Sequence, residues 1–314
     1  MKNFADRLLD AVDKKKNPSI IGLDSDFSRI PGILKKESEG RSSDNFQAAG
    51  NCMLEFNRRI VDSIHDIVPA VKIQSAFYEQ YGPAGMSAFL ETAKYARSKG
   101  LLVIGDVKRG DIGNTSRAYS NAYLGKVQFF NSLKSGYDLD AITVNPYLGS
   151  DGVMPFLEDC RNYGKGIFVL VKTSNPSSAE LQDLACGDKK FYECVANEVK
   201  NWGEKLTGER GYSAVGAVVG ANYPDQAASL RKIMPGAIFL VPGYGAQGGL
   251  ASDIVPNFKS DGYGALIHSA RDVIFAYEKH GAQNDFAKAA RQAALKMRDD
   301  VLSSLKNVGI SPWK

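Results

Sequence analysis

The segment LLVIGDVKRGDIGNT, residues 101–115, is the most informative part of the sequence. It begins with four consecutive apolar residues, and Asp106, Lys108 and Asp111 follow within a few positions. A short apolar run that ends in charged residues is typical of a buried strand in a parallel sheet, because such a strand reaches solvent mainly at its ends. The stretch therefore predicts a strand over residues 101–108 whose carboxyl end carries charged side chains.

Short apolar runs of the same kind recur along the chain and alternate with longer amphipathic segments. The eight predicted strands cover residues 19–24, 70–74, 101–108, 141–145, 166–173, 214–220, 237–242 and 264–269. Eight strands in this rhythm favour a closed (β/α)8 TIM barrel, an α/β fold, over an open sheet. We expect a single domain over residues 1–314, since barrels of this length are common.

The segments between the strands predict helices and surface insertions. Apolar residues recur at steps of three or four from Met53 to Ile67, after the candidate N-cap Asp44, and again over residues 285–305. Three polar or Gly-, Ser- or Pro-rich stretches are predicted to be surface loops: residues 26–41, 125–138 and 174–189. For residues 125–138 an interface role is an alternative, but a plain surface insertion is favoured.

Bulk composition excludes several classes of protein. The chain is 44% hydrophobic and 24% charged, as in ordinary globular domains. The net charge of +4 comes from scattered basic residues, which gives nucleic acid binding little support. No apolar run approaches the roughly 20 residues that cross a bilayer, and the N-terminus does not resemble a signal peptide, so we expect a cytoplasmic protein. The His and Cys residues show no metal-ligand spacing, and no metal site is predicted.

Four charged residues near two strand ends form the candidate reaction centre. Asp106 and Lys108 are two apart on one strand and should project from the same face. Lys72 ends the neighbouring strand, about 4.8 Å away, and Asp111 lies on the following loop. Alternating carboxylates and ammonium groups favour each other's charged state, so we expect Lys108 to be a proton donor. From spacing alone, a structural ion-pair network remains the alternative.

The segment DVKRGDIGNT resembles the Asp-x-Lys-x-x-Asp-Ile-x-x-Thr signature of the orotidine 5'-phosphate decarboxylases. Further motifs of that family occur in family order: IGLD, VKIQSAFYEQYG, VNPYLG, VLVKTSNP, VVGAN, VPGYGAQGG and SAR. The long insertions and the KTSNP form are similar to the larger bacterial and apicomplexan subgroup. The resemblance implies conversion of orotidine 5'-monophosphate (OMP) to UMP and CO2 without a cofactor or metal.

The resemblance also implies roles for the charged residues. Lys108 would protonate C6 as CO2 leaves, and Asp106 would lie against the substrate carboxylate and orient Lys108. Asp24 and Lys72 would hold the ribose hydroxyls; that Asp24 merely caps the next helix is the less favoured alternative. In the family, the residues at the positions of Asp111, Ile112 and Thr115 come from a partner subunit. The resemblance therefore implies a homodimer.

The remaining implied contacts concern the base and the phosphate. Thr173 and Ser174 would bind the pyrimidine edge, although by themselves they could be turn residues. Gln247 in the Gly-rich loop 243–249, with Ala270 and Arg271, would bind the phosphate, although the loop by itself could equally be a plain flexible loop. The other substrate-binding candidates are Gln74, Asn145 and Pro242.

Two rival functions remain. A Mg²⁺-dependent sugar-phosphate decarboxylase or aldolase of the same barrel group shares the Asp-x-Lys pattern but does not explain KTSNP together with PGYGAQGG. A non-catalytic nucleotide-binding barrel should lack at least one of the four charged residues, and all four are present.

Overall fold

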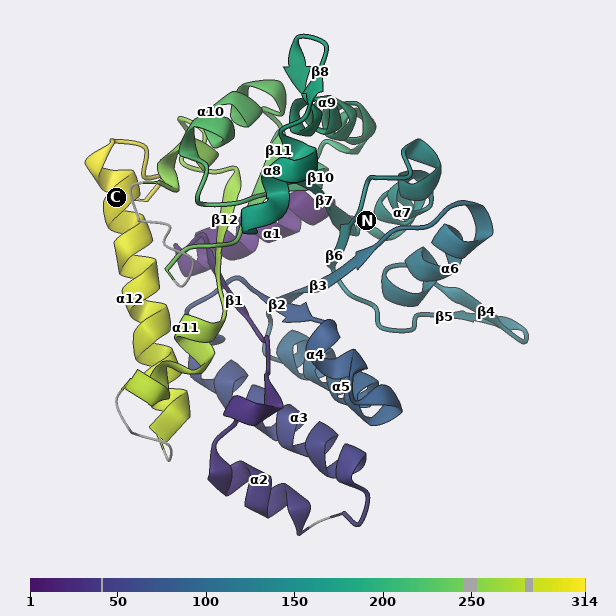
Figure 1. Ribbon diagram of the computed structural model, residues 1–314, viewed down its shortest axis with the longest axis vertical. Helices are drawn as coiled ribbons and strands as arrows, with labels where there is room; N and C mark the ends of the chain where they lie inside the picture. Colours follow the sequence, from purple (N-terminus) through teal and green to yellow (C-terminus); the bar gives the residue numbers. More distant parts are fainter. Residues whose placement is uncertain (41, 246–252, 280–284, 314) are drawn as a thin grey trace.

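The computed structural model describes the chain except for residues 41, 246–252, 280–284 and 314. Within the described part, eight parallel strands close into a barrel in the order β1-β12-β11-β10-β7-β6-β3-β2 (Figure 1). The strands are β1 (Ser19–Gly22), β2 (Ala70–Gln74), β3 (Leu102–Arg109), β6 (Ala141–Val144), β7 (Gly166–Lys172), β10 (Ser213–Val219), β11 (Ala237–Val241) and β12 (Ala265–Ser269). The predicted barrel and its eight strands are confirmed.

Helices connect the strands and cover the outside of the barrel (Figure 1). The longer ones are α3 (Asn45–Ile64), α5 (Gly82–Ser98), α6 (Gly113–Tyr123), α7 (Ser150–Tyr163), α9 (Phe191–Gly203), α10 (Pro224–Ile233) and α12 (Phe286–Asn307); the short α4 (Ala76–Glu79) and α11 (Arg271–Ile274) lie at strand ends. The cap predicted for α3 is confirmed, because the Asp44 carboxylate accepts from the backbone N–H groups of Phe46 and Gln47. The apolar face of α12 is buried, as predicted for the C-terminal helix.

The N-terminal helix α1 (Phe4–Lys15) closes the barrel at the end where the strands begin. Its Phe4 ring meets Phe168 of β7 edge-on, with 6.0 Å between centroids. Arg7 pairs with Asp140, the residue that precedes β6. With this end covered, the open mouth of the barrel lies at the carboxyl ends of the strands, where TIM barrels carry their active sites.

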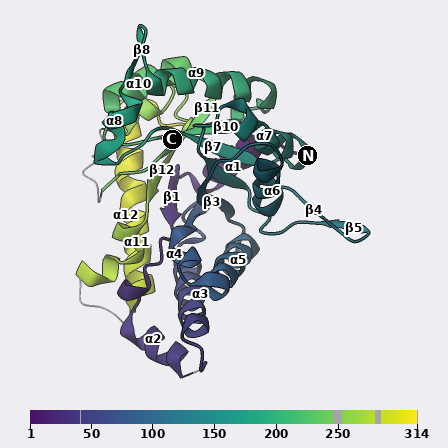
Figure 2. The ribbon, with the colours of Figure 1, turned by 45° about the vertical axis from the view of Figure 1, so that its right-hand side comes forward.

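The three insertions are more structured than the predicted surface loops. Residues 26–41 contain the helix α2 (Gly32–Glu39), which packs against α3 and buries Leu34, so the predicted surface loop is wrong for this part of the stretch. Residues 125–138 form a hairpin of β4 (Val127–Phe129) and β5 (Ser132–Lys134) that projects from the barrel (Figure 2). Residues 174–189 contain α8 (Ala179–Gln182) and lead into a second hairpin, β8 (Ala185–Cys186) and β9 (Lys189–Lys190).

Among the helices in the described ranges, none is both long and apolar enough to cross a bilayer.

Candidate active site

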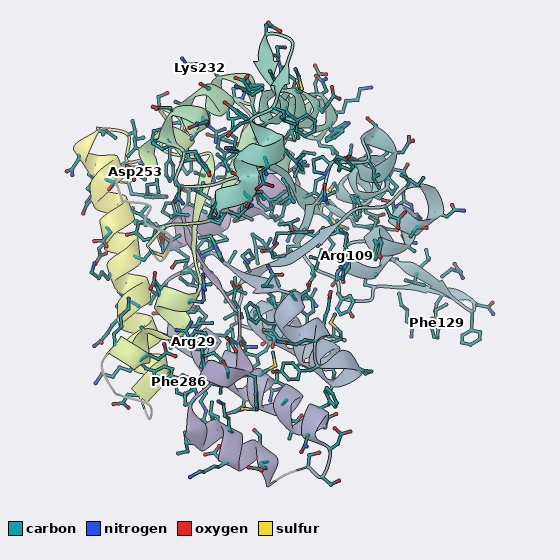
Figure 3. The ribbon with its side chains drawn as sticks, viewed as in Figure 1. Arg29, Arg109, Phe129, Lys232, Asp253 and Phe286 are labelled. Carbon is teal, nitrogen blue, oxygen red and sulfur yellow. The ribbon has the colours of Figure 1, made fainter. Side chains whose placement is uncertain are left out.

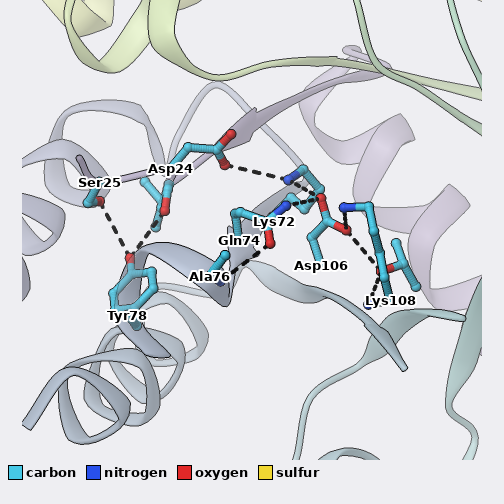
Figure 4. A network of polar contacts seen from close by, with 10 residues as sticks. Asp24, Ser25, Lys72, Gln74, Ala76, Tyr78, Asp106 and Lys108 are labelled. Carbon is cyan, nitrogen blue, oxygen red and sulfur yellow. Dashed lines mark hydrogen bonds and ion pairs between the residues drawn. The ribbon is translucent and has the colours of Figure 1, made fainter. Parts of the chain in front are cut away.

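Asp106 is the centre of a charged cluster at the mouth of the barrel. The Lys72 ammonium lies 2.8 Å from Asp106 Oδ2, and the Lys108 ammonium lies 2.6 Å from Asp106 Oδ1 (Figure 4). Asp24, at the end of the neighbouring β1, lies 3.5 Å from the Lys72 ammonium through Oδ1. The structure therefore brings together three of the four predicted charged residues, with Asp24 beside them.

The cluster holds its carboxylate and its ammonium in charged form. Burial by itself would raise the pKa of Asp106, but Lys72 and Lys108 outweigh it and hold that pKa well below 3.8. Burial would likewise lower the pKa of Lys72, but Asp106 and Asp24 outweigh it and raise that pKa above 10.5. Asp106 is thus a fixed negative charge between two ammonium groups.

Lys108 reaches Asp106 through a distorted backbone, not through simple alternation along the strand. Its φ is +45°, and the pairing of β3 with β6 shifts register between Gly105 and Arg109. The Thr143 hydroxyl of β6 accepts from the Lys108 backbone N–H at 2.9 Å and donates to Asp106 Oδ1 at 2.9 Å. The left-handed conformation is unfavourable for lysine, so this bridge helps to hold the residue there.

Gln74 completes the set of groups around Asp106. Its side-chain amide donates to Asp106 Oδ2 at 2.9 Å, so this oxygen accepts from both Gln74 and Lys72. Figure 4 shows Gln74 between Lys72 and the start of α4. In the structure Gln74 thus contacts the reaction centre, while a substrate contact for it stays a prediction.

Two adjoining cavities open above the cluster, and Lys72, Asp106, Pro242 and His268 line both. The first has a volume of about 390 Å³ and the second about 180 Å³. The first is further lined by Lys108, Thr143, Leu170, Thr173, Ser174, Asn175, Gln182, Val218 and Leu240. The second is further lined by Asp24, Gly243, Tyr244, Ser269, Ala270 and Arg271. A ligand lying across both would pass directly over Asp106.

The second cavity contains part of the predicted phosphate site. Ala270 and Arg271 lie at the start of α11, with the Arg271 side chain exposed. Gly243 and Gly245 have φ values of +99° and +78°, which favour glycine, so the backbone after β11 makes a turn that few other residues adopt. Gln247 and most of the predicted glycine-rich loop lie outside the described residues.

Five predicted site residues that the structure describes line neither cavity of this single chain: Gln74, which contacts Asp106 instead, and Asp111, Ile112, Thr115 and Asn145. Asp111 accepts a hydrogen bond from the Ile112 backbone N–H, and Ile112 and Thr115 are exposed at the start of α6. Asn145 is exposed, and its side-chain oxygen accepts from the Tyr147 backbone N–H at 3.0 Å, as in a turn. A substrate contact for Asn145 stays a prediction.

Residues 48–284 match the model of the "Orotidine 5'-phosphate decarboxylase / HUMPS family". The chain belongs to this family.

Individual members of the orotidine 5'-phosphate decarboxylase family match over nearly the full chain. The "Orotidine 5'-phosphate decarboxylase" of Caldicellulosiruptor saccharolyticus is 41% identical over 305 residues, covering 97% of this chain and all of that protein. The protein of the same name from Rhodopirellula baltica is 40% identical, covering 96% and 99%. The solved structure of Leishmania donovani OMP decarboxylase aligns with a TM-score of 0.71 at 29% identity, covering 96% and 98%. Matches of this length span the parts of the chain that contain the insertions, and membership of the larger subgroup stays a prediction.

Across the described ranges, no group of three or more His, Cys, Asp or Glu side chains is placed so that it could hold a metal ion.

Three residues near the cluster were missed from the sequence: Thr143, Gln182 and His268. Thr143 could have been found, because it is the one polar residue inside the apolar run 141–144. Gln182 lies in a predicted surface loop and gave no signal. His268 is buried in β12, and its Nε2 has no hydrogen-bond partner among the described residues. Burial and the nearby Lys72 lower the pKa of His268 well below 6.5, so it is neutral beside the cluster.

Proposed function

We propose that this chain decarboxylates OMP to UMP and CO2, with Lys108 as the proton donor to C6. The observation that carries the proposal is the pair of ammonium groups, Lys72 and Lys108, on the two oxygens of the buried Asp106 at the floor of the cavities. The names of the curated relatives support the substrate.

The proposed reaction follows from the charges around Asp106. The bond between C6 and the carboxylate carbon breaks, CO2 leaves, and the electron pair stays on C6. The Lys108 ammonium stabilises this developing negative charge and then transfers its proton to C6, and solvent later restores the proton on the amine. Asp106 keeps Lys108 oriented, and Lys72 keeps Asp106 ionised.

Substrate recognition divides between the two cavities. In the proposal the pyrimidine occupies the first cavity beside Ser174, and Asp24 with Lys72 binds the ribose hydroxyls. Arg271 and the backbone near Ala270 bind the phosphate in the second cavity, joined by Gln247. Binding of the phosphate contributes to catalysis because it holds C6 of the substrate in place over Lys108.

We also propose a homodimer in which each subunit supplies Asp111, Ile112 and Thr115 to its partner's site. Asp111 stands outside the charged cluster of its own chain, and the Ile112 side chain is 53% exposed. Tyr147, in the connection between β6 and α7, is another exposed aromatic side chain, at 76%. Exposed apolar groups of this kind favour association with another protein surface. The cytoplasmic location stays a prediction from the sequence.

The test of the reaction is the loss of OMP absorbance with purified protein in EDTA, alongside Lys108→Ala. We expect robust formation of UMP in EDTA and a loss of at least about 10³-fold for the variant, because the proton donor is removed. Activity that disappears in EDTA and returns with Mg²⁺ would support the Mg²⁺-dependent relatives. Binding of UMP without any turnover would support the non-catalytic barrel.

A further inference from the structure

Residues 174–190, which join β7 to α9, fold back over the end of β7, and we call them the β7 cap. The Lys172 ammonium, at the last position of β7, lies 2.8 and 2.9 Å from the two carboxylate oxygens of Asp183 in the cap. Its side chain is fully buried, and the ammonium lies 4.5 Å from the centre of the Tyr223 ring. An ion pair at a buried site therefore fixes the cap to the strand beside the first cavity.

Gln182, the neighbour of Asp183, is hydrogen bonded to Thr173 twice. Its side-chain oxygen accepts from the Thr173 backbone N–H at 2.9 Å, and its side-chain nitrogen donates to Thr173 Oγ1 at 2.7 Å. The Thr173 hydroxyl in turn donates to Asn175 Oδ1 at 2.6 Å. Both hydrogen-bond donors of Thr173 are thus used within the chain, and neither is left for a ligand.

Ser174 differs from Thr173 in this respect. It lines the first cavity, and its hydroxyl makes no hydrogen bond to any residue that the structure describes. Its position is fixed from the opposite side by Gly220, where an added Cβ would lie only 3.0 Å from Ser174 Cα and Cβ. Ser174, the first residue of the β7 cap, thus packs against the residue that follows β10, and its hydroxyl has no hydrogen-bond partner among the described residues.

We infer that Gln182 is a positioning residue for base recognition. Its two hydrogen bonds hold Thr173 in place, and the neighbouring Ser174 is thereby oriented so that its hydroxyl can bind the pyrimidine edge. The inference rests on the proposed function and deepens it. Of the two predicted base contacts, Ser174 binds the pyrimidine, whereas Thr173 is hydrogen bonded to Gln182 and has a structural role. It also gives the β7 cap a role as a wall of the base site.

The test compares a ligand that has a base with one that lacks it. Gln182→Met keeps the length of the side chain and removes both hydrogen bonds to Thr173. We expect UMP to bind about tenfold more weakly by calorimetry, which corresponds to about 1.4 kcal/mol and is the size of one or two neutral hydrogen bonds. Ribose 5-phosphate, which lacks the base, should bind within about twofold of the wild-type affinity.

Two further variants make the comparison specific. Leu181→Ala changes the preceding residue of α8, which is 62% exposed, and should leave both affinities unchanged. Gln182→Glu keeps an oxygen to accept from the Thr173 backbone N–H and should recover part of the UMP affinity. Equal losses for UMP and ribose 5-phosphate in Gln182→Met, or no loss for either, would overturn the inference. Turnover of OMP by the wild-type protein tests the proposed function separately.

Discussion

The Thr143 hydroxyl connects the two residues on which the proposed chemistry depends. It donates to Asp106 and accepts from the backbone of Lys108, so its loss should loosen both at once. We expect Thr143→Val, which keeps the shape of the side chain, to lower kcat about 10- to 100-fold, as for a hydrogen bond to a charged group. Steady-state kinetics on OMP would measure this. Thr143→Ser retains the hydroxyl and should stay within a few-fold of wild type; a Val variant with wild-type kcat would contradict the bridging role.

His268 gives the fold a pH dependence that belongs to one side chain. Burial, Lys72 and Lys108 lower its pKa well below 6.5, against the smaller opposing effect of Asp106. The unfolded chain therefore binds more protons than the folded chain as the pH falls below about 6.5, and the free energy of unfolding decreases.

A His268→Asn variant should lose this dependence. Between about pH 7.5 and pH 5.5, the free energy of unfolding of the wild type should fall by about 1.4 kcal/mol more than that of the variant. Urea unfolding at both pH values measures the difference. The pH window avoids Asp106, whose contribution is present above about pH 3.8 and is lost only at lower pH, because its pKa is lowered in the fold. Parallel pH profiles for the two proteins would count against a neutral His268.

At the level of strands and helices, the sequence predicted the features that depend on neighbouring residues, namely the barrel strands and a helix start. Each apolar run gave a barrel strand, and the Asp44 cap marked the start of α3. The pairing of Asp106 with Lys108 was also predicted, but for an incomplete reason, because the φ of +45° at Lys108 depends on Thr143 from another strand. Such a contact between residues 35 positions apart leaves no periodic signal in the sequence.

The β7 cap shows the same limit for a whole segment. Its polar composition predicted a surface loop, and parts of it are exposed. Composition does not reveal that Asp183 pairs with Lys172, because this lysine belongs to the buried strand β7 and lies 11 positions earlier in the sequence. The cap is therefore an element held to the barrel by a tertiary ion pair.

That ion pair should show strong coupling between its two partners. Asp183→Asn leaves the fully buried Lys172 ammonium without a carboxylate and should lower the free energy of unfolding by about 2 kcal/mol. The estimate lies below that for a fully buried pair because Asp183 is 34% exposed and partly screened by solvent. The double variant Lys172→Met/Asp183→Asn should lose less than the sum of the two single variants. Urea unfolding of all four proteins measures the coupling, and additive losses would mean that the pair does not anchor the cap.

At the scale of the whole molecule, one chain presents a site that lacks one of its four predicted charged residues. Asp111 is on the β3–α6 connection and is not in contact with the cluster around Asp106. The hairpin β4–β5 follows α6 and carries Phe129 and Phe130 in exposed positions, with Phe129 far from the barrel (Figure 3). An exposed aromatic pair on a projecting hairpin is an apolar surface of the kind that partner proteins cover, and an interface role for it stays a prediction.

Mixing two inactive proteins tests whether Asp111 acts across the interface. In a dimer of one Lys108→Ala chain and one Asp111→Ala chain, the site on the Asp111→Ala chain has its own Lys108 and receives a wild-type Asp111 from its partner. The other site lacks both residues. If half of the dimers are mixed after unfolding and refolding together, and one of their two sites is restored, activity should reach about a quarter of the wild-type value per chain. If each Asp111 served its own chain, both sites of the mixed dimer would be defective, and the mixture would stay as inactive as its components.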